Sequence, residues 1–318
     1  MRETSFNNLK SILQKSTISQ ANQEVRKTVS TIIEDVRKNG DKALLKYVNK
    51  FENKKATLSS LIIKPKVLKE AYNSITKNQR EALNLAYDRI NFYHSHQIKK
   101  NHKFKDKLDT TFSIQWNPIE NIGLYIPGGL ASYPSTVLMT AIPAKIAGVK
   151  NIMISVPSAE GKVSKLTLAA AYLCKVNRVY NMGGAQAIAA FAFGTKTIQK
   201  AFKVFGPGNQ FVAEAKKQLF GTIGIDLPAG PSEILVLADK YSKPDLIALD
   251  ILAQAEHDPH AKTYLVSTSK TLIQEVIQKI KETQKIHKFK NATESLKNFS
   301  YAILAKNSFE MFEISNFI

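Results

Sequence analysis

The sequence predicts an α/β protein with mainly parallel sheets, preceded by a helical N-terminal region. Three observations support this fold class: apolar residues recur every three or four positions over residues 20–100, short apolar strands alternate with helices after residue 110, and Gly/Pro-rich turns follow several of these strands. Alternation of strands and helices is typical of parallel sheets with helical crossovers. The length of 318 residues predicts about two domains.

The helical region contains amphipathic stripes with recognisable ends. Gly40 predicts a helix stop after the stripe of Val25, Val29, Ile32, Ile33 and Val36. The segment Thr76-x-x-Gln79 has the form of a capping box and predicts the start of a later helix. We interpret these stripes as core packing.

The rest of the chain alternates between strands and helices. Strands are predicted at 122–126, 151–156, 178–181, 204–205, 234–237, 263–267 and 301–304. Helices are predicted at 134–148, 164–175, 185–193 and after Asn209. The basic run 99–107 is interpreted as a connector.

Composition argues against several classes of partner. The chain has 45 Lys and Arg against 26 Asp and Glu, a formal net charge of +19, but only six of the basic residues are Arg. Because nucleic-acid readers favour Arg, we interpret the charge as solvated Lys-rich faces and expect no nucleic acid, with polyanion binding as the alternative. No apolar run approaches the ~20 residues that span a bilayer, so no membrane partner is expected. The single cysteine, Cys174, favours a cytoplasmic location.

Four Gly/Pro-rich turns fall at the ends of predicted strands: Pro127-Gly128-Gly129, Gly183-Gly184-Ala185-Gln186, Gly206-Pro207-Gly208-Asn209 and Pro228-Ala229-Gly230-Pro231-Ser232-Glu233. In open parallel sheets, ligands bind at the carboxyl ends of strands, and glycine lets backbone N–H groups approach a phosphate. None of the turns completes Gly-x-Gly-x-x-Gly. Together they predict one extended ligand cleft, with nearby polar side chains from Tyr125, Gln186, Asn209 and Ser232.

A second cluster of polar residues lies near residue 255. Gln254 and His257 are three residues apart on a predicted helix and so share one face. An amide oxygen and an imidazole on one face can provide two ligands to a divalent cation. On spacing alone, a polar helix end with a histidine near the C-terminal dipole is the alternative.

Five ordered segments resemble those of histidinol dehydrogenases: Gly123–Gly129, Gly183–Ala189, Gly206–Asn209, Asp226–Glu233 and Gln254–His257. The resemblance implies two incomplete Rossmann-like domains. The main domain would be discontinuous, 20–124 plus 234–318, with 125–233 inserted as the second domain and 1–19 as an N-terminal segment. It implies NAD-dependent oxidation of L-histidinol through histidinal to L-histidine, the last step of histidine biosynthesis, by a homodimer with one Zn²⁺ per subunit.

The resemblance also implies roles for particular residues. Tyr125, Gln186 and Asn209 match NAD-contacting positions, Ser232 matches a substrate-contacting position, and Gln254 and His257 match zinc ligands that also meet the substrate. The family's adjacent Glu-His acid/base pair, its further Asp and His zinc ligands and its C-terminal arm are expected beyond Ile318. We therefore expect a C-terminally truncated form with impaired turnover. The alternative is a non-catalytic protein that binds nucleotide or dimerises.

Overall fold

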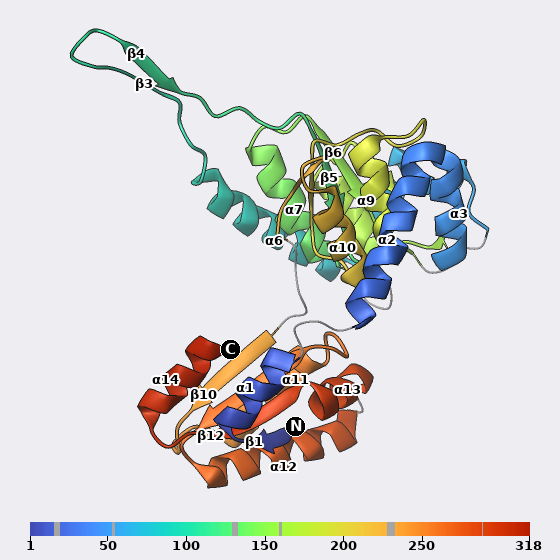
Figure 1. Ribbon diagram of the computed structural model, residues 1–318. Helices are drawn as coiled ribbons and strands as arrows, with labels where there is room; N and C mark the ends of the chain where they lie inside the picture. The colour runs from blue at the N-terminus through green and yellow to red at the C-terminus, as the bar shows by residue number, and fades with distance from the viewer. Residues whose placement is uncertain (16–19, 53–54, 129–132, 159–160, 228–232, 288) are drawn as a thin grey trace. The chain divides into compact units, whose positions relative to one another are not determined.

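The computed structural model describes residues 1–15, 20–52, 55–128, 133–158, 161–227, 233–287 and 289–318 (Figure 1). The chain forms two compact units, one made of Met1–Gln20 with Ala229–Ile318 and the other of Ala21–Pro228. We call them unit 1 and unit 2. Both contain helices and mostly parallel strands, which confirms the predicted α/β class.

Unit 2 is built on a six-stranded sheet with the order β2-β7-β6-β5-β8-β9. The edge strand β2 pairs antiparallel with β7, and the other neighbours are parallel. The strands are β2 (Ile62–Ile63), β5 (Asn121–Tyr125), β6 (Asn151–Ser155), β7 (Arg178–Tyr180), β8 (Lys203–Phe205) and β9 (Gly224–Ile225). The chain moves outward from β5 to β7 and returns to the other side of β5 with β8. This reversal makes the carboxyl ends of β5 and β8 the expected position of a ligand crevice.

Helices cover both faces of this sheet (Figure 1). Alternation along β5 sends Ile122 and Leu124 into one core and Tyr125 into the other. The first core contains α5 (Pro65–Ser74), α6 (Lys77–Ser95), α7 (Pro134–Ile146) and α8 (Lys165–Leu173). The second contains α2 (Gln20–Asn39), α3 (Asp41–Phe51), α4 (Leu58–Leu61), α9 (Gly184–Phe193) and α10 (Gln210–Leu219).

The predicted helix boundaries are confirmed where turn chemistry is strong. Gly40 separates α2 from α3 at a φ of +50°, and Thr76 and Gln79 form the reciprocal capping box that begins α6. The basic run 99–107 is more than a connector, because it contributes β3 (His102–Lys105) to a hairpin with β4 (Thr111–Ile114). This hairpin extends away from the sheet (Figure 1), and both of its strands are exposed along their whole length.

Unit 1 is a four-stranded parallel sheet with the order β1-β12-β11-β10. The strands are β1 (Arg2–Thr4), β10 (Glu233–Ala238), β11 (Lys262–Ser267) and β12 (Ser300–Leu304). One core, around Leu265 and Ala302, is formed with α11 (Pro244–Ala255), α12 (Lys270–His287) and α13 (Lys290–Asn298). The other, around Tyr264 and Ile303, is formed with α1 (Phe6–Lys15) and α14 (Ser308–Phe317).

The observed units differ from the predicted domains. Residues 21–124 belong with 125–228 rather than with 234–318, because β5 lies inside the six-stranded sheet and α2 and α3 share a core with α9. The N-terminal segment is not separate either, since Arg2 of β1 pairs with Tyr301 of β12. Pairing between distant segments leaves no local pattern, so the sequence carried no signal for this division. Within the described ranges, every helix is too short or too polar to cross a lipid bilayer.

Candidate functional site

Three of the four predicted turns begin at the carboxyl edge of the unit 2 sheet, after β5, β7 and β8. Their backbones pack directly against neighbouring segments. A Cβ atom on Gly128 would lie 2.0 Å from the carbonyl oxygen of Pro157, and one on Gly206 would lie 2.0 Å from that of Tyr125. Glycine is therefore required by close approach at the switch point. The fourth turn, with Ser232, lies outside the described residues.

Tyr125 and Gln186 come together around a carboxyl group that no sequence motif indicated. Oε1 of Glu52 accepts hydrogen bonds from the N–H of Gly183 at 2.9 Å and from Nε2 of Gln186 at 3.0 Å. The Tyr125 hydroxyl accepts one from the N–H of Gly184 at 3.2 Å. Gln186 and Tyr125 are 1% and 3% exposed. These residues form a buried polar cluster at the N-terminus of α9.

The environment of Glu52 favours its neutral form. Burial raises the pKa of the Glu52 carboxyl group to about 7, although the hydrogen bonds from Gly183 and Gln186 act in the opposite direction. Its second oxygen, Oε2, is buried and meets no hydrogen-bond partner in the described part of the chain. Burial also raises the pKa of Tyr125, and the nearby Glu52 adds to that shift. Carboxyl groups with a shifted pKa at a sheet edge are typical of functional sites.

The N–H groups expected to meet a phosphate are largely occupied by the protein itself. At α9, those of Gly183 and Gly184 have acceptors in the polar cluster. At α10, Oδ1 of Asn209 accepts hydrogen bonds from Phe211 and Val212 at 3.1 and 3.2 Å, as an N-cap residue does. Asn209 is exposed, and its amide nitrogen is the part of the side chain left for a ligand.

An ion pair between the buried Lys216 and the partly buried Asp226 holds the turn that leads to Asn209. Lys216, which is 3% exposed, donates to the carbonyl oxygen of Gly206 at 2.7 Å and to the carboxylate of Asp226. Asp226 in turn accepts from the N–H of Gly206 at 2.7 Å. Both polar groups of Gly206 are thereby satisfied and the turn is fixed. A lysine on the apolar face of a helix, between Ala215 and Leu219, was the available signal.

Gln254 and His257 lie in unit 1 at the end of α11. The helix ends at Ala255, so His257 belongs to the following turn, but its N–H donates to the carbonyl oxygen of Gln254 at 3.3 Å. The predicted shared helix face is therefore replaced by a turn that joins the backbones of the two residues. Nε2 of Gln254 is buried without a partner among the described residues. Because the two ends of an amide are assigned only from their contacts, the same position could present its oxygen to a cation.

These two residues fit part of a zinc site. The described residues include no group of three or more His, Cys, Asp and Glu side chains arranged to hold a metal ion. Gln254 and His257 would thus supply two of the typically four ligands of zinc. The amide with an unpartnered end and the exposed imidazole suit that role chemically.

Comparison with known proteins shows which family this chain is similar to. Residues 15–318 match the sequence profile of histidinol dehydrogenase. The histidinol dehydrogenase of Brucella suis is 40% identical over 298 residues, which cover 93% of this chain and 69% of that protein. The one from Acinetobacter baylyi is 44% identical over 295 residues, or 92% and 69% of the two chains. A crystal structure of histidinol dehydrogenase from Elizabethkingia anophelis aligns with a TM-score of 0.83 and 35% identity, over 92% of this chain and 67% of that one.

Proposed function

The chain belongs to the histidinol dehydrogenase family of enzymes, and from this premise we propose that it serves the NAD-dependent oxidation of L-histidinol through histidinal to L-histidine. It spans about 69% of the length of the curated relatives it matches. The observation that supports the proposal best is the polar cluster of Glu52, Tyr125 and Gln186 at the carboxyl edge of the unit 2 sheet.

In this proposal the carboxyl edge of unit 2 binds NAD⁺. Tyr125 at the end of β5, Gln186 in the first turn of α9 and Asn209 at the start of α10 contact the nucleotide along this edge of the sheet. The buried hydrogen bonds of Tyr125 and Gln186 limit their side-chain motion, so the contacts are pre-organised. When bound, the nicotinamide supplies the hydride acceptor.

Unit 1 carries the proposed zinc and substrate residues. Gln254 and His257 would hold the ion, and Ser232 would contact the substrate. Zinc, when bound, would orient the amine and imidazole of histidinol and so position its alcohol carbon. Gln254 and His257 would supply two of the zinc ligands, and the proposed assembly is a homodimer.

Binding measurements test the proposal. We expect the 318-residue protein to bind NAD⁺ by calorimetry and to retain zinc by elemental analysis. L-histidinol should bind more tightly than an amino alcohol that lacks the imidazole, because the ring supplies a metal ligand. Absence of NAD⁺ binding at millimolar concentration would contradict the proposal. Equal affinity for the two alcohols would contradict L-histidinol as the substrate.

A further inference from the structure

Glu52 reaches the α9 turn from a distant part of the sequence. It caps the C-terminal end of α3, where its N–H donates to the carbonyl oxygen of Val48 at 2.9 Å. Its carboxyl group contacts Gly183, 131 residues further along the chain. Because α3 and α9 share one core, the contact joins two packed helices.

The carboxyl group takes the place that an anion takes at a glycine-rich helix start. It receives the N–H of Gly183, and the helix dipole favours negative charge there. Two other hydrogen bonds hold the turn, from the N–H of Gly184 to the Tyr125 hydroxyl at 3.2 Å and from the Ser155 hydroxyl to the carbonyl oxygen of Met182 at 2.7 Å. Gly184 has a φ of +66°, and a Cβ on Gly183 would lie 2.4 Å from Pro157, so larger side chains could not replace these glycines without strain.

We propose that Glu52 is a positioning residue of the nucleotide site, holding the Gly183–Gln186 turn and the Gln186 amide in the geometry that contacts the nucleotide. This inference rests on the proposed NAD⁺ function. Glu52 acts through Gln186 and the backbone of the turn. In the absence of its carboxyl group, the buried Gln186 amide loses its acceptor and the turn loses one of its anchors.

The hold on the turn depends on the charge of the carboxyl group. An ionised carboxylate accepts hydrogen bonds about twice as strong as those of a neutral acceptor. The phenol of Tyr125 faces it from β5, whereas α9 carries no titratable side chain. On α3, Lys46 is paired with Asp35 at 2.7 Å, and Lys50 lies over the ring of Phe51. With a pKa of about 7, Glu52 ionises within the range of a binding assay.

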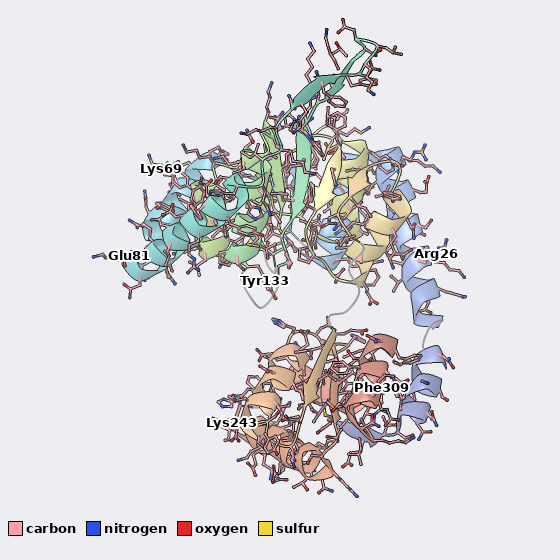
Figure 2. The ribbon with its side chains drawn as sticks, turned by 90° about the vertical axis from the view of Figure 1, so that its left-hand side faces the viewer. Arg26, Lys69, Glu81, Tyr133, Lys243 and Phe309 are labelled. Carbon is pink, nitrogen blue, oxygen red and sulfur yellow. The ribbon has the colours of Figure 1, made fainter. Side chains whose placement is uncertain are left out.

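Calorimetry with NAD⁺ at pH 6 and pH 8 tests the inference. If the protein binds NAD⁺ only when Glu52 is ionised, the affinity of the wild type rises up to about tenfold from pH 6 to pH 8, in proportion to the ionised fraction of Glu52. Glu52→Gln keeps an acceptor without a charge and should bind with little pH dependence, whereas Glu52→Ala should bind more weakly at both pH values. Glu81→Gln, an exposed glutamate on α6 of the same unit (Figure 2), should behave as wild type.

Two results would overturn the inference. One is a wild-type affinity that falls as the pH rises, because the carboxylate would then oppose the nucleotide. The other is equal affinity in the wild type and Glu52→Ala. If the wild type does not bind NAD⁺, the proposed function fails. Amide hydrogen exchange measured without nucleotide then tests whether Glu52 holds the Gly183–Gln186 turn. The Gly183 and Gly184 amides should then exchange faster in Glu52→Ala than in wild type, and equal rates would overturn the inference.

Discussion

Replacing Glu52 by Gln should remove a pH-dependent loss of stability in unit 2. Gln has the same shape and keeps an acceptor for the N–H of Gly183, but it does not ionise. Burial raises the pKa of Glu52 from 4.5 to about 7 in the folded protein. The folded state therefore holds the proton more tightly than the unfolded chain does. The resulting stabilisation is complete below pH 4.5 and is lost as the pH rises through about 7.

The size of this effect follows from the two pKa values. Between pH 5 and pH 8 the wild type should lose about 2 to 3 kcal/mol of unfolding free energy through Glu52, at ~1.4 kcal/mol per pKa unit. The physical cost is that of keeping a carboxylate charged with Oε2 buried and unpartnered among the described residues.

Urea unfolding followed by circular dichroism at four pH values from about 5 to 8 measures the difference. The unfolding free energy of Glu52→Gln, minus that of the wild type, should increase by about 2 to 3 kcal/mol from pH 5 to pH 8. Glu81→Gln controls for general charge effects and should parallel the wild type. Curves for Glu52→Gln and wild type that remain within about 0.5 kcal/mol of a constant separation would refute the reasoning.

Three further predictions concern the Lys216 ion pair, the Gly206 turn and the proposed zinc ligand His257. Lys216→Met should lower the unfolding free energy by about 3 kcal/mol, because it leaves the partly buried carboxylate of Asp226 unpaired. As a control, Lys217→Met at the exposed neighbouring position should lower it by less than about 0.5 kcal/mol in the same urea experiment. Gly206→Ala should be more destabilising than Gly221→Ala, since both have positive φ but only the first Cβ meets a backbone atom; equal melting temperatures would contradict the clash. His257→Ala should remove most of the bound zinc, and an unchanged metal content by elemental analysis would exclude it as a ligand.

Local patterns predicted much of the fold. Gly40 and the capping box of Thr76 and Gln79 mark helix ends through interactions within a few residues. Apolar runs between turns located the central strands of both sheets to within a few residues. The β3–β4 hairpin was missed because its strands are exposed on both sides, and β1 was missed because three residues next to the N-terminus carry no pattern.

The candidate site was predictable only in part. Tyr125, Gln186 and Asn209 lie in or next to Gly-rich turns that short motifs reveal, and the structure places these turns at one sheet edge. Glu52 could not be found in this way, because it lies 134 residues before the Gln186 side chain that it contacts. The turn motifs also did not indicate that the protein's own side chains accept hydrogen bonds from the N–H groups of Gly183, Gly184 and Phe211.

The sequence by itself determined the α/β class, the resemblance to histidinol dehydrogenases and the positions of the glycine turns. The periodicity of apolar residues and the residue preferences of turns extend over only a few positions, so both can be recognised in the sequence without a structure. Only the tertiary structure decided which segments share a sheet and which acceptor meets each buried N–H. A buried polar group must find a partner wherever the fold brings one. For Gly183 that partner is Glu52, at the end of a helix in another part of the chain.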